Sequence, residues 1–140
     1  MAIVQTQTTS FKAELYQGIH DLTTDVIKIA LYTANADLNE TTTVYSTALV
    51  GQVVATGYTE GGSQLTPITV STSGYTAYVG FPNISWTADI TARCALIYNA
   101  SKGNKSVAVL DFGSDKTMSP TFTITMPANT ATTALIRSSY

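Results

Sequence analysis

The sequence predicts a mainly β protein: a jelly-roll-like β-sandwich of about eight short antiparallel strands with one N-terminal helix. Threonine supplies about 25 of the 140 residues, and its branched β-carbon suits a pleated sheet. Turn signals of glycine, proline and asparagine recur about every eight to twelve residues, which favours a sandwich or barrel over alternating strands and helices. Periodicity does not distinguish a jelly roll from other sandwich topologies. At this length we expect one domain over residues 1–140.

The first residues predict an arm followed by the single helix. Residues 2–9 are polar and rich in threonine and glutamine, which is typical of an extended arm or an edge strand. Ser10 can cap a helix over residues 11–21, because a serine hydroxyl accepts a hydrogen bond from a free N–H of the first turn. The apolar stripe of this helix has helical spacing and consists of Phe11, Leu15, Ile19 and Leu22.

Short β-prone segments separated by turn signals make up the rest of the chain. Residues 34–43 predict a loop or a single helical turn, and residues 57–62 predict a tight turn. Pro67 indicates that its strand lies at a sheet edge or contains a bulge, because proline has no N–H to donate to the hydrogen bonds between strands. The predicted strands outside the central hairpin are 25–33, 42–55 (broken near Gly51), 64–71, 75–81, 84–87, 121–126 and 132–138.

Residues 92–115 predict a β-hairpin on which the rest of the fold is organised. Two apolar β-prone runs flank a short polar turn that contains Gly103 and Asn104. Both runs are apolar on both faces, whereas a strand with one wet face would alternate apolar and polar residues. Alternation places Val107 and Val109 on one face of the return strand and Ala108 on the other. We therefore expect the hairpin to lie deep in the structure, ending near residues 114–116.

Composition excludes several classes of function. The net charge is −2, with 11% charged residues and no basic stripe, whereas a nucleic-acid backbone would demand one. No apolar run approaches the length of a membrane span, and the N-terminus does not look like a secretory signal, so we expect a protein that is made in a cytoplasm and stays soluble. The low charge also removes the repulsion that keeps monomers apart, which favours assembly as much as it fits an ordinary neutral β-domain.

Catalytic candidates are few. His20 is the only histidine and falls at the predicted helix end, where a structural or surface role is the stronger interpretation. Cys94 is the only cysteine, which excludes an internal disulfide; it lies in an apolar run and predicts a buried, inert thiol. The triplet Asp111-Phe112-Gly113 matches a kinase metal-binding motif, but the chain lacks the other kinase motifs. The sequence therefore predicts no catalytic residue and no cofactor.

Two groups of residues could bind a ligand, one a calcium ion and the other a sugar. Asp37, Asn39 and Glu40 carry oxygen ligands, but a calcium loop needs more carboxylates at closer spacing, so a solvated loop is favoured and no metal site is predicted. Eight tyrosines and Trp86 could form a platform for stacking sugars. Most of them occupy strand positions where aromatic residues usually pack in the core, which leaves glycan binding as the weaker alternative.

Four stretches in order resemble a family of small virion proteins of tailed bacteriophages, the head decoration (cement) proteins. The stretches are residues 10–15 with 18–20, residues 27–33, residues 57–62, and residues 95–99 through 108–113. The resemblance covers nearly the whole chain.

The resemblance implies a jelly-roll subunit on the outer surface of a phage head, added during assembly in the host cytoplasm. Its partners would be neighbouring major capsid subunits, which it clamps, and a further copy of itself in a homodimer, with a trimer as the alternative. No direct contact with nucleic acid or membrane is implied, and no catalytic residues. We expect residues 2–9 and 34–47 to contact the neighbours. A phage tail or fibre module that binds host glycan remains the alternative.

Overall fold

The computed structural model describes residues 3–139, which form ten strands, one α-helix and one 3₁₀ helix. In chain order these are β1 (Thr6–Gln7), α1 (Thr9–Tyr16), β2 (Ile27–Tyr32), β3 (Ser63–Gln64), β4 (Thr69–Ser73), β5 (Thr76–Gly80), β6 (Ile84–Trp86), β7 (Ile90–Asn99), η1 (Ala100–Lys102), β8 (Lys105–Met118), β9 (Phe122–Ile124) and β10 (Ile136–Ser138). The expectation of a mainly β protein with one N-terminal helix is confirmed for this part of the chain.

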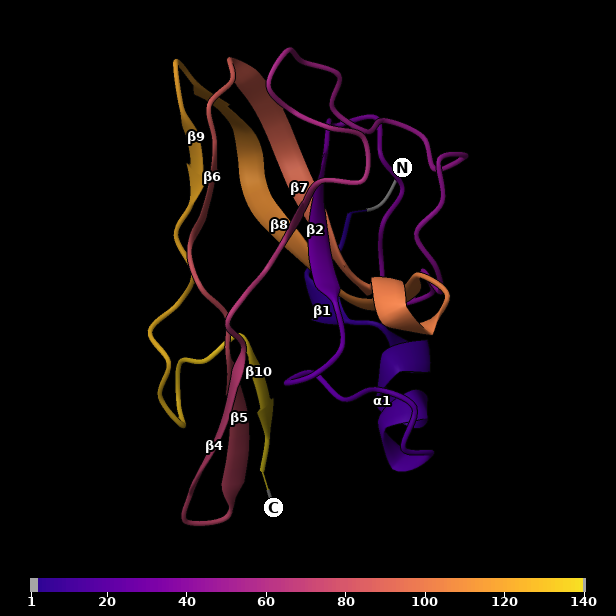
Figure 1. Ribbon diagram of the computed structural model, residues 1–140, viewed down its shortest axis with the longest axis vertical. Helices are drawn as coiled ribbons and strands as arrows, with labels where there is room; N and C mark the ends of the chain where they lie inside the picture. The colour runs from indigo at the N-terminus through magenta and orange to yellow at the C-terminus, as the bar shows by residue number, and fades with distance from the viewer. Residues whose placement is uncertain (1–2, 140) are drawn as a thin grey trace.

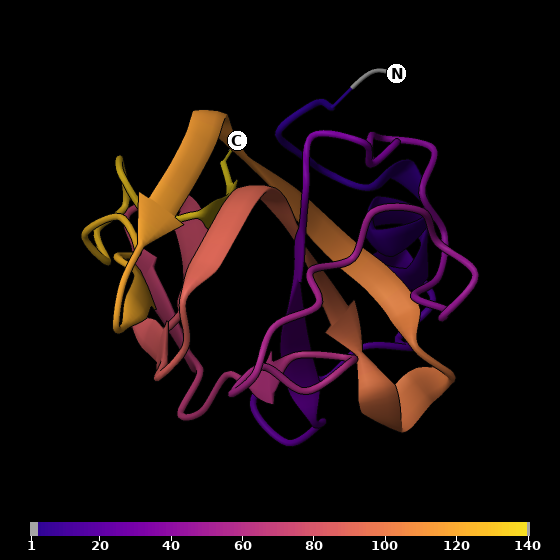
Figure 2. The same cartoon turned by 90° about the horizontal axis from the view of Figure 1, so that it is seen from above.

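The strands form three antiparallel sheets (Figure 1). The largest has the order β1-β8-β7-β2-β3, and the others have the orders β10-β5-β4 and β6-β9. The β7–β8 hairpin is the longest element and runs from η1 at one end to the neighbourhood of β9 at the other (Figures 1 and 2). The hairpin predicted over residues 92–115 is confirmed, although both strands are longer than predicted.

One face of the large sheet packs on the two smaller sheets. Ile29 of β2 and Ile97 of β7 have no exposed surface and belong to a single apolar cluster that reaches all three sheets. The smaller sheets contribute Val79, Trp86, Phe122 and Ile136 to this cluster. Burying such side chains stabilises the fold by about 1.5–3 kcal/mol each.

The opposite face of the large sheet is covered by the N-terminal arm and by residues 36–49 of the long loop 33–62, whereas Val53 and Tyr58, further along the same loop, belong to the first cluster. Tyr32, Leu96 and Tyr98 of the sheet pack there with Leu38 and Tyr45 of the loop in a second apolar cluster. Because both faces are covered, β2 and β7 are apolar on both sides, as the sequence indicates.

Two irregularities in the β7–β8 pairing correct the predicted hairpin. Ile97 pairs with Ala108 but Tyr98 pairs with Ser106, so Val107 is an extra residue and packs on the same side as Ala108 rather than with Val109. A one-residue bulge reverses side-chain alternation in this way.

The second irregularity lies between Asp111 and Lys116 of β8, close to the predicted end of the hairpin. The strand instead bends around Gly113, whose φ is +83°, and continues to Met118. Asp111 stabilises the bend, since its Oδ1 accepts the Gly113 N–H at 2.8 Å and lies 3.1 Å from Arg93 Nη1. The kinase-like triplet is therefore part of a strand bend.

The N-terminal prediction is confirmed for the edge strand and wrong for the helix limits. β1 pairs with β8 at the edge of the large sheet, whereas Ala2 lies outside the described residues. Thr8, not Ser10, caps α1, with its Oγ1 accepting the Phe11 N–H. The helix ends at Tyr16, because Gly18 takes a left-handed φ of +71° that stops the helical path.

The predicted stripe is correspondingly incomplete, because only its first two members lie in the helix. Phe11 and Leu22 are buried, whereas Leu15 is 41% exposed.

Three other predicted segments differ from the structure. The segment 64–71 is not one strand, because Pro67 separates β3 of the large sheet from β4 of another sheet. Residues 42–55 form only isolated bridges, through Val44, Gln52 and Ala55. Of residues 132–138, the last three form β10, and the turn of residues 130–134 precedes them.

We predict that Gly62→Ala destabilises the protein far more than Gly74→Ala. Both glycines have left-handed φ values, +78° and +58°. An alanine in this backbone conformation is less stable by roughly 1–2 kcal/mol at either position. An added Cβ at Gly62 would also overlap the carbonyl of Ile29, whereas open space surrounds Gly74. Urea unfolding should show an extra loss of about 2 kcal/mol or more for Gly62→Ala. Equal losses would contradict the close approach of residue 62 to β2.

Candidate functional surface

The N-terminal arm and the 34–47 loop, expected to contact neighbours, lie side by side along one edge of β8 (Figure 2). The Val4 N–H donates to Leu38 O at 3.0 Å, and the Thr9 N–H donates to Glu40 O at 2.9 Å. These backbone bonds join residues 3–9 to residues 34–47, and we call the combined area the arm–loop surface.

The start of β8 anchors both halves of this surface. Ser106 donates its N–H to Thr43 O at 2.8 Å and its hydroxyl to Thr42 O at 2.7 Å. The same hydroxyl lies 2.8 Å from Thr8 Oγ1, at the junction of the arm and α1. Thr8 and Ser106 are completely buried, so this link is shielded from competing water. The arm and the loop are thus held as one unit.

The outer side of the arm–loop surface is polar, threonine-rich and almost uncharged. The arm, residues 3–9, contains no charged residue, and the loop contains only Asp37 and Glu40. Val4 and Val44 are 41% and 43% exposed. Depletion of charge with some exposed apolar area is the composition found at the centre of protein–protein contacts.

A layer of buried tyrosines supports the loop from beneath. Tyr45 of the loop stacks on Tyr98 of β7 with ring centroids 4.4 Å apart. Tyr98 donates its hydroxyl to Gly61 O at 2.6 Å, and burial raises its pKa to about 12. Gln52 accepts from Tyr58 and from the Gly61 N–H, and donates to Tyr45.

This layer bears on the glycan alternative. Burial also raises the pKa of the Tyr32 and Tyr58 hydroxyls, and Trp86 is 4% exposed. These aromatic rings are core residues, as the sequence indicates, and their faces are not presented for stacking a sugar. Within residues 3–139, the large exposed aromatic side chains are Tyr16 and Tyr75, which come from different elements.

A groove of about 370 Å³ lies between the second half of β8 and β9. Its walls are mainly apolar, with Gln5 and Lys116 as polar members. The apolar residues lining it include Leu110, Phe112, Met118, Phe122, Ile124 and Leu135. This composition suits apolar contact and provides no nucleophile with an adjacent base.

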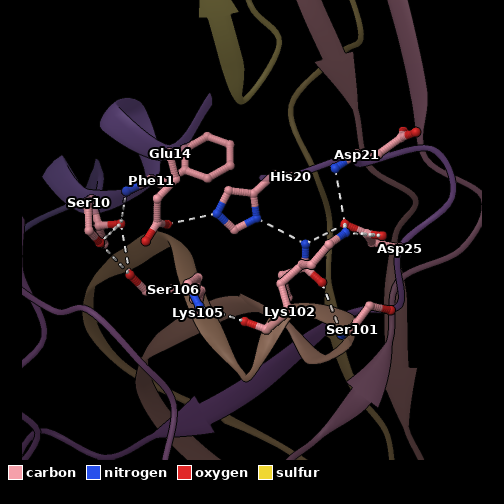
Figure 3. A network of polar contacts seen from close by, with 12 residues as sticks. Ser10, Phe11, Glu14, His20, Asp21, Asp25, Ser101, Lys102, Lys105 and Ser106 are labelled. Carbon is pink, nitrogen blue, oxygen red and sulfur yellow. Dashed lines mark hydrogen bonds and ion pairs between the residues drawn. The ribbon is translucent and has the colours of Figure 1, made fainter. Parts of the chain in front are cut away.

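His20 is part of a buried polar network, as Figure 3 shows. Its side chain has no exposed surface, and its Nε2 lies 2.8 Å from Glu14 Oε1. Its Nδ1 lies 2.9 Å from Asn99 Nδ2, so both ring nitrogens are engaged. Asn99 also contacts Asp25, which Lys102 holds at 2.9 Å. The network connects the helix segment to the tip of the hairpin, which is a structural role.

The other chemical candidates are also placed. Asp37 Oδ1 accepts from Asn39 Nδ2 at 3.2 Å, and Asn39 Oδ1 accepts from Thr41, so these side chains stabilise their own loop. No group of three or more potential metal ligands occurs within residues 3–139. In the same part of the chain, no helix combines the length and the apolar character needed to cross a membrane.

Comparison of the chain with protein-family models, with curated proteins and with solved structures finds no match. Any functional assignment therefore depends on the chain itself and on the surface described above.

Sequence reasoning missed the contacts that assemble this region. Thr8 and Ser106 are 98 positions apart, and His20 and Asn99 are 79 apart. No local signal distinguishes these partners from the many other polar residues of the chain. The one usable clue is the serine, Ser106, that directly precedes the apolar run of residues 107–110.

We predict that Cys94 is unreactive in the folded protein. It is completely buried, and burial raises the pKa of its thiol to about 12, so almost no thiolate exists at pH 8. Ellman's reagent should modify it only after urea unfolding. Stoichiometric reaction within minutes in native buffer would contradict this placement.

We predict that Asp25→Asn removes an acid-sensitive part of the stability. Burial opposes ionisation of Asp25, but hydrogen bonds from Asn99, the Asp21 N–H and Lys102 outweigh it and lower its pKa from 3.8 to about 2. A depressed carboxyl pKa adds stability that is present above about pH 4 and is lost as the pH falls towards 2. Urea midpoints measured across this range should fall less for Asp25→Asn than for wild type. Parallel pH profiles would contradict the role of Asp25.

Proposed function

We propose that the chain is a structural virion protein, a decoration (cement) protein that bridges and stabilises neighbouring major capsid subunits on the head of a tailed phage. The observation that carries the proposal is the arm–loop surface: two segments expected to contact neighbours form one anchored, nearly uncharged area. The resemblance of residues 10–20, 27–33, 57–62 and 95–113 to head decoration proteins supports the same function.

The mechanism is mechanical. Packed DNA pushes a capsid outward, and a protein that spans two capsid subunits adds contacts that must break before the shell opens. A stable contact of this kind buries more than about 1,200 Å² in total. Copies on a symmetric lattice would also meet through self-complementary contacts, as a dimer or, alternatively, a trimer.

The same proposal includes the finer description of the fold as a jelly-roll-like sandwich. Its support is the single apolar cluster enclosed between the large sheet and the two smaller sheets. The proposal assigns the chain no catalytic activity, cofactor, nucleic-acid contact or membrane contact. The proposed absence of catalytic activity is supported by two observations: both nitrogens of His20 are engaged, and Cys94 is buried.

The binding test uses purified, expanded phage heads and two matched variants. Val44→Glu adds a charge to the arm–loop surface, and Val70→Glu adds the same charge on β4, where the side chain is 53% exposed. We expect wild type and Val70→Glu to co-sediment with heads equally, and Val44→Glu to bind at least about tenfold more weakly, because an unpaired charge is costly to bury in a contact.

The outcomes separate the two candidate functions. Equal binding by both variants would show that the contact with the head does not include the arm–loop surface around Val44. A protein that ignores heads but binds host polysaccharide would exclude the decoration function and favour the tail or fibre alternative. Solution mass, measured in parallel, determines whether the free protein is a dimer or a trimer.

A further inference from the structure

The buried imidazole of His20 joins two parts of the chain that are distant in sequence (Figure 3). It follows α1 and its ring centroid lies 4.9 Å from that of Phe11 in the helix. On its other side it meets Asn99, the last residue of β7 and the N-cap of η1 at the hairpin tip. The contact therefore holds the helix segment against the hairpin tip.

The side-chain amide of Asn99 has only one satisfactory orientation. Its Oδ1 accepts the Ser101 N–H at 3.0 Å, which caps η1. Its Nδ2 donates to Asp25 Oδ2 at 2.8 Å and to His20 Nδ1 at 2.9 Å. Turning the amide by half a rotation would place its oxygen against the Asp25 carboxylate and its NH₂ group against the Ser101 N–H. The Ser101 N–H and the Asp25 carboxylate thus determine which group of the Asn99 amide faces His20.

This orientation determines the protonation state of the ring. Since Asn99 presents an N–H, Nδ1 of His20 must accept and carries no proton. Nε2 then carries the ring proton and donates it to Glu14 Oε1 at 2.8 Å. An imidazolium carries a proton on both nitrogens. Protonation would therefore bring two donors face to face at 2.9 Å inside the protein.

Charged groups face the ring and its partner Asn99 from each neighbouring element. Glu14 faces it from α1, and the ion pair of Asp25 with Lys102 of η1 lies behind Asn99. Asp21, whose N–H binds Asp25, is exposed in the turn between. Two carboxylates and one ammonium group therefore lie around the His20–Asn99 contact. A second proton on the ring is incompatible with the observed orientation of the Asn99 amide. Either the ring stays neutral, or the amide turns.

We propose that His20 is a proton-operated latch between the α1 segment and the β7–β8 hairpin tip. The neutral ring closes the latch as observed. Protonation turns Asn99, which breaks its bonds to the Ser101 N–H and to Asp25 and so uncaps η1. Because Ala100 and Ser101 also hydrogen bond to Val26, the loosening extends to the start of β2. Thr8, at the other end of α1, borders the arm–loop surface.

The test is an NMR titration of the full chain from about pH 7.5 to about pH 5, the range in which histidine charge changes. At neutral pH we expect imidazole ¹⁵N shifts of the Nε2–H tautomer. On acidification, the Ser101 backbone amide and the Asn99 side-chain NH₂ should shift with the same midpoint as His20. The exchange protection of the Ser101 amide should fall about tenfold, the equivalent of one hydrogen bond of about 1.4 kcal/mol.

Two variants provide the controls. His20→Asn keeps an oxygen acceptor for Asn99 but cannot titrate, so Ser101 should become insensitive to pH in this range. Glu14→Gln keeps an acceptor for Nε2 but removes the negative charge, at a side chain that is 16% exposed. It should therefore leave the fold intact and move the common midpoint to lower pH, which decides the question even if His20→Asn does not fold.

Three results would overturn the proposal. The first is an imidazole that is charged, or protonated on Nδ1, at neutral pH. The second is a titration of His20 that leaves Ser101 and Asn99 unchanged. The third is a ring that stays neutral, with Ser101 protected, down to the pH at which the whole protein unfolds.

Discussion

The burial of the β2–β7–β8 backbone from both faces is the constraint on which the rest of the structure depends. Strands such as Ile27–Tyr32 and Ile90–Asn99 carry apolar residues on both sides, so each side needs its own cover. The two smaller sheets, with Val53 and Tyr58, provide one cover, and the arm with residues 36–49 of the long loop provides the other. The loop has little regular structure of its own, and its backbone is satisfied by Gln52, Tyr98 and Ser106. A long loop built into the core in this way can present a defined surface.

Much of the fold is predictable because its signals are local. The hairpin, β2 and the turns follow from apolar runs and from glycine or proline at their ends. The errors arise where a choice depends on distant residues. Thr8 and Ser10 can both cap a helix in isolation, and the structure places Thr8 at the cap, where its hydroxyl also meets the buried hydroxyl of Ser106. Val107 faces the opposite way because of a bulge in its pairing with β7, which no alternation pattern reveals.

The candidate site shows the same division. Low charge and threonine content indicated a contact surface, and the arm and the loop could be named separately. The two segments form one surface because backbone hydrogen bonds join Val4 to Leu38 and Thr9 to Glu40. No sequence pattern indicates these hydrogen bonds. The residues with reactive chemistry, Cys94 and His20, are both buried and serve packing or a polar network. Both residues thus serve the fold itself, and the proposed contact function depends on neither of them.

Hydrogen exchange on the free and the head-bound protein tests the central claim most directly. We propose that residues 3–9 and 34–47 form the contact, so binding should slow amide exchange there, while β4, β5 and the turn between them exchange at unchanged rates. The strands β2 and β7, already buried on both faces, should be protected in both states. Protection concentrated on β4 and β5, with none in the arm or the loop, would contradict the account.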